Sequence, residues 1–432
     1  MSTSVSCHNP EKKFDTAILL VGLTPVFMVV LPWDFGNEMN PYRGFMRGNS
    51  LPATIVEMLF LLIVMRRGFS PTAAVAALPL MTKAGLLMLL TAILWTTSTV
   101  ATEPIAAIFG LVKMFMHLMF CMAFYHQFER WTIFDRNKIW LAIGCGVLAY
   151  CVLWLSNILI YHPTGDDWLW FVPALTNVRW AGFFALAGFC AGIGSLSSRV
   201  DGSHSVRRFL IALSFSTVGL SIAFWTGSRG AVLASLAAAI GPSVFVKARR
   251  QIILLSLSAA FLGLVIGWAL PIVHQLYGIE RIIGTLTPAN GLAGLSSGRT
   301  EVWADTAQQI RQRPIAGWGV DQFTYVGPKT ALGLKHPHQA ILQLLFSVGT
   351  LGALAMLFII YPFASAVSRA SKQPYQWAGL AYLSGAIAYG LYDGFFYYTF
   401  PVMIFLVSIV CVGRTTLLQS VTDRSNSPVP RG

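Results

Sequence analysis

Three basic residues of the chain lie in short polar segments next to long apolar stretches. Arg229 lies in WTGSRGA, Arg299 lies in SSGRTEVW, and His338 lies in KHPHQ. A guanidinium group binds phosphate oxygens through paired, charge-assisted hydrogen bonds. A neutral imidazole accepts a proton near neutral pH. We therefore regard the two arginines as candidates for binding a phosphate-bearing group, and His338 as a candidate general base.

The surroundings of Arg229 favour an anion-binding role. Gly227 and Gly230 permit close approach of the backbone, and the next apolar run would begin a helix whose free N–H groups attract negative charge. An arginine at membrane depth is costly and usually has a functional partner. The alternative is an arginine whose side chain simply extends to the membrane interface.

The histidine segment is open to other interpretations. His336 and His338 could be two interfacial histidines, or two ligands of a metal site. A metal site would need further His, Asp or Glu ligands, and the acidic residues of the preceding loop do not have ligand spacing. The general-base interpretation of His338 therefore leads.

Other polar residues are weaker candidates. Asp393, in GLYDGFFYY, could orient a base or bind a sugar, or could be an exposed helix cap. Gln339 follows the histidine directly, and Arg179 begins an apolar run. The pair Asp166 and Asp167 is compatible with a metal site, and equally with a solvated turn.

These residues must be positioned by a membrane protein. Of the 432 residues, 55% are hydrophobic and 11% are charged, whereas soluble domains carry about 25% charged residues. Apolar stretches that match the hydrocarbon core of a bilayer recur along the whole chain. We expect an all-α integral membrane protein with about a dozen transmembrane helices, forming one polytopic domain over residues 1–432. The expected spans are 16–32, 51–66, 82–98, 104–126, 138–160, 179–197, 207–226, 230–246, 250–272, 338–362, 375–393 and 400–418.

The net charge of +13 is explained by topology. Lys and Arg clusters fall on every second connection, which is the positive-inside pattern. Both termini are therefore expected in the cytoplasm, and nucleic acid is not an expected partner. The polar first fifteen residues precede an apolar run that we interpret as the first span, with no cleavable signal. The six cysteines lie in or near spans or on the cytoplasmic tail, so we expect no disulfide framework.

The connection 273–337 is a long loop on the outer side of the membrane. Within it, residues 298–313 are expected to form an amphipathic helix, because Trp303, Ala307 and Ile310 share one face at i, i+4, i+7 spacing. Such a helix could lie along the membrane surface with its arginines toward lipid headgroups. It would also carry Arg299 near its start.

Four motifs in a fixed order resemble a known family. TGSRGA, SSGRTEVW, RPIAGWGVDQF and HPHQAILQLLFSVGTLG, covering roughly residues 225–355, are similar to the O-antigen ligase superfamily of bacterial membrane glycosyltransferases. This group contains O-antigen ligases, O-antigen polymerases and protein O-oligosaccharyltransferases. The resemblance implies a GT-C glycosyltransferase fold, a periplasmic loop at 273–337 and transfer at the periplasmic face of the inner membrane. It also implies an undecaprenyl-diphosphate-linked O-antigen as donor, with neither metal nor cofactor.

The resemblance also implies roles for single residues. Arg229 and Arg299 would hold the donor diphosphate, and His338 would be the base. The supporting candidates are Asp393, His336, Gln339 and Arg179. This chain departs from the family pattern at Gln339, where many relatives have Asn, and at Pro337, which interrupts the usual spacing.

Three functions are compatible with these features. The leading one is a ligase that transfers polysaccharide to the lipid A-core oligosaccharide. Membrane lipids would contact the spans of the protein. The same donor chemistry would serve an O-antigen polymerase or a protein O-oligosaccharyltransferase. A transporter or flippase would instead place charges along the middle of its spans. Lys113 is the only clear candidate for such a deep charge, and the other charges gather at the outer face, which favours an enzyme.

Overall fold

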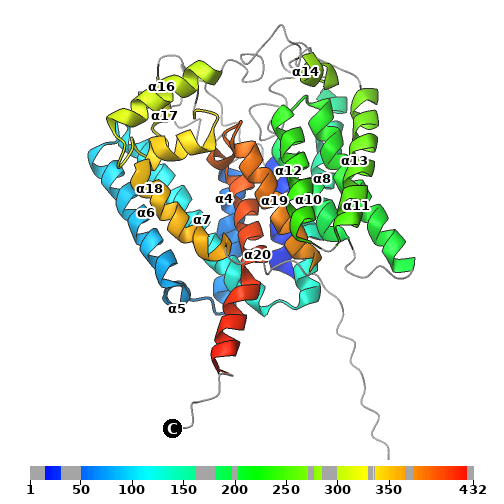
Figure 1. Ribbon diagram of the computed structural model, residues 1–432, viewed down its shortest axis with the longest axis horizontal. Coiled ribbons are helices and arrows are strands. Elements are labelled where there is room, and N and C mark those ends of the chain that lie inside the picture. The colour runs from blue at the N-terminus through cyan, green and yellow to red at the C-terminus, as the bar shows by residue number, and fades with distance from the viewer. Residues whose placement is uncertain are drawn as a thin grey trace, which may run out of the picture.

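The computed structural model is all-helical over the residues that it describes (Figure 1). The described residues are 15–30, 50–161, 181–196, 203–246, 248–270, 277–284, 299–328, 334, 336–364 and 373–425. Each of the expected spans coincides with a helix, except that the first is divided into two short helices at Leu23. The all-α class predicted from the sequence is therefore confirmed for the described part of the chain.

The helices of the first half are followed along the colour gradient of Figure 1 from blue to cyan. They are α1 (Thr16–Gly22), α2 (Thr24–Val30), α4 (Ser50–Arg66), α5 (Pro71–Ala77), α6 (Leu80–Thr99), α7 (Pro104–Arg130) and α8 (Ile133–Tyr161).

The second half contains the longer loop elements as well as further apolar helices. They are α10 (Ala181–Ser195), α11 (Ser203–Trp225), α12 (Arg229–Phe245), α13 (Arg249–Ala269), α14 (Ile279–Gly284), α16 (Arg299–Gln312), α17 (Phe323–Val326), α18 (Ala340–Ala364), α19 (Pro374–Gly390), the 3₁₀ turn η5 (Phe395–Tyr397) and α20 (Thr399–Ser425).

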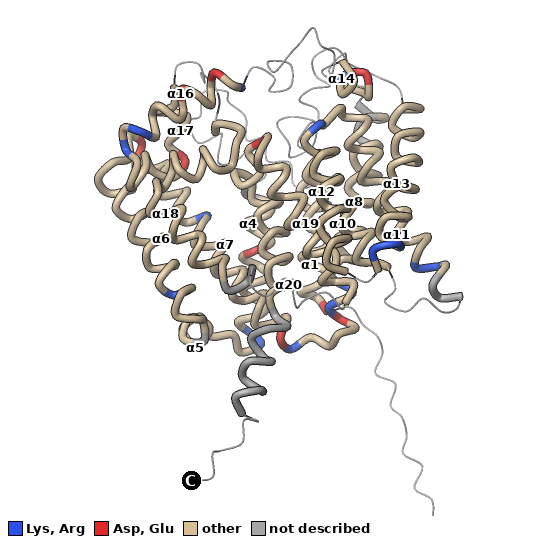
Figure 2. The backbone as a smooth tube through the Cα atoms, viewed as in Figure 1, with Lys and Arg blue, Asp and Glu red and all other residues tan. Residues whose placement is uncertain are grey.

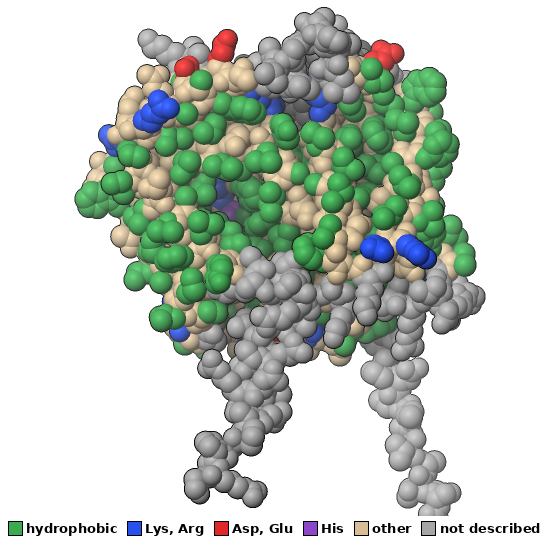
Figure 3. Space-filling view, in the orientation of Figure 1, with side chains coloured by type: hydrophobic (Ala, Val, Ile, Leu, Met, Phe, Trp, Pro, Cys, Tyr) green, Lys and Arg blue, Asp and Glu red, His purple; other side chains and the backbone are tan. Residues whose placement is uncertain are grey.

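Several of these helices can cross a membrane. By length and composition, six are long and apolar enough, and they lie at Leu80–Thr99, Pro104–Arg130, Ile133–Ser156, Val206–Trp225, Arg249–Ala269 and Ala340–Tyr361. Shorter apolar helices lie at Ala181–Ser195, Arg229–Phe245 and Thr399–Gly413. Figure 3 shows hydrophobic side chains over the viewed face of this bundle, as expected for a surface that meets lipid. The chain is therefore a multi-pass membrane protein.

The helices pack in pairs around a continuous apolar core. Helix α11 packs against α10 and α13, α12 packs against α19, and α18 packs against α6. Figure 1 shows α16 and α17 at the same end of the bundle as α14, whereas α5 and the last turns of α20 lie at the opposite end. The bundle therefore has one end that carries the loop helices and the start of α12, where we look for the site.

Two pairs of ionisable side chains lie deep among the helices, within the part of the chain that the structure describes. Lys113 Nζ lies 3.2 Å from Asp321 Oδ2, and His117 Nδ1 lies 2.8 and 3.0 Å from the two carboxylate oxygens of the fully buried Glu57. A charge is tolerated at this depth when it is paired. The sequence singled out Lys113 alone at this depth and missed Glu57, which lies on α4 and whose partner lies sixty residues later on α7. Figure 3 shows a hollow in the viewed face with a basic side chain and a histidine inside it.

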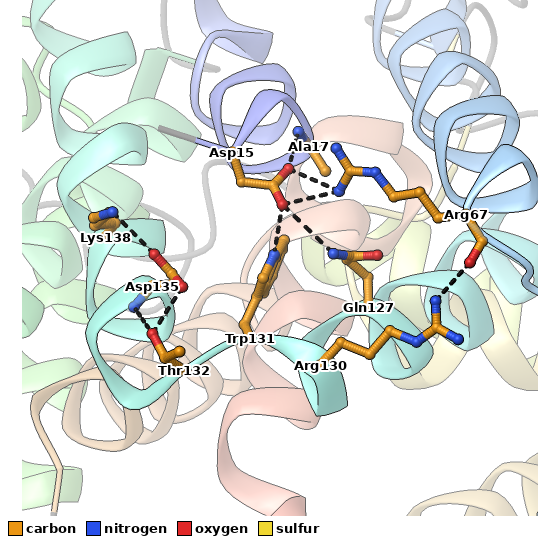
Figure 4. Close-up of polar contacts among 9 residues, drawn as sticks. All are labelled: Asp15, Ala17, Arg67, Gln127, Arg130, Trp131, Thr132, Asp135 and Lys138. Carbon is orange, nitrogen blue, oxygen red and sulfur yellow. Dashed lines mark hydrogen bonds and ion pairs between the residues drawn. The ribbon is translucent and has the colours of Figure 1, made fainter. Parts of the chain in front are cut away.

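A second polar cluster joins three turns at the end opposite α16 (Figure 4). Asp15 caps α1 by accepting from the Ala17 N–H at 2.7 Å. The same carboxylate accepts from Arg67 Nη1 at 2.8 and 2.9 Å and from Trp131 Nε1 at 3.0 Å. The start of α1 is thereby tied to the turns after α4 and after α7, which fixes this end of the bundle.

Candidate functional site

The proposed base is held by a carboxylate from a distant part of the chain. His338 lies two residues before α18, and Asp393 lies between α19 and η5. His338 Nδ1 is 2.8 Å from Asp393 Oδ1, which also accepts from the Gly394 N–H at 2.8 Å. When Nδ1 donates to the carboxylate, the neutral ring carries its lone pair on Nε2. The pair is therefore suited to accept a proton at Nε2.

Asp393 is ionised in this setting. Burial acts to raise the pKa of its carboxyl, but the hydrogen bond and charge of His338, followed by the charges of Arg299 and His336, outweigh burial. The net effect holds the pKa of Asp393 below its ordinary value. A carboxylate that stays charged holds the neighbouring imidazole in one tautomer and one orientation.

Arg299 approaches this carboxylate from the loop end of the bundle, and Arg229 lies near enough to Arg299 for their charges to interact. Arg299 begins α16, places Nη2 at 3.9 Å from Asp393 Oδ2, and donates through Nη1 to the Tyr392 carbonyl. Arg229 begins α12, and its charge interacts with that of Arg299. Two neighbouring guanidinium groups repel one another, and an anion between them would relieve the repulsion. The arrangement is therefore suited to an anionic ligand.

A third arginine, Arg281, which sequence reasoning did not single out, lies beside the turn that precedes Arg229. Gly227 has φ +63°, and a Cβ there would lie 3.3 Å from Cδ of Arg281 and 3.0 Å from the Gly278 carbonyl oxygen. The Gly278 N–H donates to the Trp225 carbonyl at 2.9 Å, so α14 is fixed over the turn before α12. No periodicity in the sequence could show this contact, because it depends on how the loop folds back on α11.

The supporting candidates are placed differently from one another. His336 is buried and contacts His338, with ring centroids 4.2 Å apart. Gln339 is next to the site, where its Oε1 accepts from the Leu342 N–H at 2.5 Å and caps α18. Arg179, Asp166 and Asp167 lie outside the described residues. Over the residues described, no three His, Cys, Asp or Glu side chains gather as a metal site would require.

Comparison with known proteins identifies a family that part of the chain resembles. Residues 209–357 match the family model described as O-antigen ligase. Over this segment the chain is similar to the O-antigen ligase family. No curated protein matches it.

The O-antigen ligase segment contains most of the site but not all of it. It runs from α11 into α18 and includes Arg229, Arg299 and His338. Asp393 lies beyond its end, so the carboxylate that joins His338 to Arg299 is supplied by the C-terminal part of the bundle. Similarity of this segment to the O-antigen ligase family supports a glycosyltransferase-like activity of the ligase or polymerase type, with glycan-lipid substrates in general.

Proposed function

We propose that this protein is an O-antigen ligase, which transfers a polysaccharide from undecaprenyl diphosphate to the lipid A-core oligosaccharide at the periplasmic face of the bacterial inner membrane. The observation that carries the proposal is the position of Asp393 between His338, at 2.8 Å, and Arg299, at 3.9 Å. It supports a site in which His338 acts as the base and Arg229 and Arg299 hold the diphosphate, which is what transfer from a diphosphate carrier requires.

The proposed reaction is a single displacement. His338 Nε2 takes the proton of the acceptor hydroxyl while its oxygen forms a bond to the anomeric carbon. The bond from that carbon to the diphosphate oxygen breaks, and the electron pair leaves with the diphosphate. Arg229 and Arg299 stabilise the charge that develops there. The products are the new glycosidic bond, undecaprenyl diphosphate and one proton on His338.

This mechanism has two chemical consequences. Attack from the face opposite the leaving group inverts the anomeric centre, so NMR of the product linkage should show inversion; retention of configuration would contradict a single displacement. The guanidinium groups supply the positive charge that a divalent cation supplies in other phosphate sites. We therefore propose transfer without metal or cofactor, which predicts an unchanged rate in a chelator.

The topology that goes with this function has about twelve spans of the GT-C type and both termini in the cytoplasm. The position of α16 and α14 at one end of the bundle and of the last turns of α20 at the other supports this orientation. The site would then face the periplasm, where its acceptor is exposed.

A complementation experiment tests the function. The wild-type chain, His338→Ala, Arg229→Ala and the control Arg311→Ala, an exposed position on α16, are expressed at matched membrane levels in a ligase-deficient strain. We expect wild type and the control to restore the lipopolysaccharide ladder, and both site variants to fail. Absence of a ladder with wild type would reject lipid A-core as acceptor and favour a polymerase or protein transfer. Movement of donor across the membrane without product linkage would favour a flippase.

A further inference from the structure

The backbone of His338 has a conformation that needs support. Its φ is +55°, in the left-handed region that residues other than glycine rarely adopt. Such a conformation persists only where surrounding contacts fix it. Because the direction of the imidazole follows from the backbone that carries it, the groups that hold the Pro337–His338 peptide also aim the proposed base.

The carbonyl side of this peptide is held by α16. Trp303 Nε1 donates to the Pro337 carbonyl oxygen at 2.9 Å. Trp303 lies one turn after Arg299, and residues four apart share a helix face. One face of α16 therefore contacts the peptide that precedes the base and, through Arg299, the carboxylate of Asp393.

The N–H side of the same peptide is held by His336. The His338 N–H donates to His336 Nδ1 at 3.2 Å, and His336 Nε2 lies 3.2 Å from the Tyr398 hydroxyl. Because Nδ1 accepts, a neutral His336 carries its proton on Nε2 and donates it to Tyr398. A Cβ at position 394 would lie 1.9 Å from the His336 ring, so Gly394 provides the space for it.

We propose that Trp303 and His336 are positioning residues that clamp the Pro337–His338 peptide from both sides and so aim His338 Nε2 at the acceptor hydroxyl. The proposal rests on the proposed function, since it takes His338 as the base. It gives α16 two tasks, because the helix that presents Arg299 to the donor also fixes the orientation of the base. Loss of the clamp should slow turnover while leaving donor binding largely intact, because misplacement of a reacting group by about 1 Å costs on the order of 10²-fold in rate.

The test compares two tryptophans that make the same kind of hydrogen bond. Trp303→Phe keeps the aromatic ring and removes the N–H that reaches Pro337. Trp318→Phe is the matched control, because Trp318 Nε1 donates to the Gln309 carbonyl at 3.0 Å in the same loop, away from the peptide of the base. We expect Trp303→Phe to lower kcat by about 10- to 100-fold with little change in donor KM, and Trp318→Phe to leave both near wild type. Equal loss in the two variants, or loss in donor KM alone, would overturn the clamp.

Two substitutions of His336 test whether its Nδ1 is needed as the acceptor for the His338 N–H. His336→Asn retains an acceptor oxygen near the position of Nδ1, whereas His336→Leu retains bulk without an acceptor. We expect the Asn variant to keep more of kcat than the Leu variant at equal folded yield. Equal kcat in the two variants would show that the N–H of His338 needs no acceptor from residue 336.

A measurement without substrate separates this proposal from the proposed function. Modification of His338 by diethylpyrocarbonate, followed by mass spectrometry, reports how accessible its Nε2 is. The rate at which diethylpyrocarbonate modifies His338 should differ from wild type in Trp303→Phe and stay at the wild-type value in Trp318→Phe. This holds even if the wild-type chain transfers no glycan. Transfer by wild type together with an unchanged modification rate and unchanged kcat in Trp303→Phe would reject the clamp and leave the proposed function standing.

Discussion

At the scale of single residues, the carboxylate of Asp393 joins two groups with different proposed roles. It contacts Nδ1 of His338 at 2.8 Å and Nη2 of Arg299 at 3.9 Å. The first contact sets which nitrogen of the imidazole is free to accept a proton. The second places the start of α16, and hence a proposed phosphate ligand, beside the base.

Asp393→Asn tests the first contact. The amide preserves the shape of the side chain but removes the negative charge and can present an N–H to the imidazole, which favours the wrong tautomer. In a hydrolase triad the equivalent change costs about 10⁴-fold in kcat, and we expect a loss of about 10²- to 10⁴-fold here. Transfer rates are compared at equal amounts of monodisperse protein, and a rate within a few-fold of wild type would show that Asp393 does not orient the base.

The lowered pKa of Asp393 gives a pH prediction of definite sign. A carboxyl whose folded-state pKa is depressed stays ionised as the pH falls through the ordinary value of about 3.9. The infrared difference between wild type and Asp393→Asn should therefore lack a protonated-carboxyl band at pH 7 and at pH 5. The band should emerge only below about pH 4. Its presence at neutral pH would mean that burial, which raises the pKa, dominates over His338 and Arg299.

The residue types and their immediate neighbours in the sequence were enough to single out Arg229 and His338 as candidates. Arg229 was distinguished by glycines and apolar flanks, and His338 by its place before an apolar run. Trp303 was predicted as part of the apolar face of the helix over 298–313, and its hydrogen bond to Pro337 joins positions 34 residues apart. Contacts of this kind depend on how separate elements meet, so residue type and spacing could not predict them.

At the scale of elements, the break in α18 fixes the loop that carries α16. Gly349 interrupts the helix with φ +61° and ψ −166°. Backbone groups on both sides of the break bond to the segment after α16: the Trp318 N–H donates to the Phe346 carbonyl at 2.7 Å, and the Thr350 N–H donates to the Pro314 carbonyl at 2.8 Å. The end of α16 is thereby attached to α18, the helix that follows His338.

Gly349→Ala should disrupt this attachment. Its backbone conformation is nearly restricted to glycine and costs about 1–3 kcal/mol for other residues, and a Cβ there would lie 2.2 Å from the Ile315 carbonyl oxygen. We expect a lower yield of folded protein and a lower melting temperature in detergent. Gly284→Ala is the control, because nothing lies within 4 Å of its Cβ. Equal melting temperatures for the two variants would contradict the role of the break.

The boundaries of the helices were predictable from the sequence, but which face of a helix is buried was harder to predict. The helix expected over 298–313 is found at Arg299–Gln312. Its most buried residues are Val302 and Thr306, whereas Ala307 of the expected face is only half-buried. The helix packs against α18, so amphipathic spacing alone does not define its buried side. The break at Gly349 escaped prediction because a single glycine within a long apolar run is a weak signal.

At the scale of the whole molecule, the charges separate into two ends and a sparsely charged middle. Figure 2 shows Lys, Arg, Asp and Glu mainly at the two ends of the helices, with few along their length. This distribution was predictable from composition and from the alternation of basic clusters. The contact between Glu57 and His117 could not be predicted in this way, because each residue alone is compatible with a polar position on an otherwise apolar helix.

Cysteine labelling tests the proposed orientation. In a background without native cysteines, Glu301→Cys on α16 and Thr72→Cys on α5 place thiols at exposed positions on opposite ends of the bundle. A membrane-impermeant maleimide added to spheroplasts should label position 301, and should label position 72 only after lysis. The reverse pattern would place the site in the cytoplasm and reject lipid A-core as acceptor at this face.

The most direct test of the central claim is transfer by purified protein in lipid nanodiscs. Wild type, His338→Ala and the control Arg311→Ala are supplied with an undecaprenyl-diphosphate-linked glycan and a lipid A-core acceptor, with and without a chelator. We predict that wild type and the control form the linked product and release undecaprenyl diphosphate at a chelator-independent rate, and that His338→Ala binds donor but forms no product. Product formation by His338→Ala at the wild-type rate would contradict the assignment of the base and the mechanism built on it.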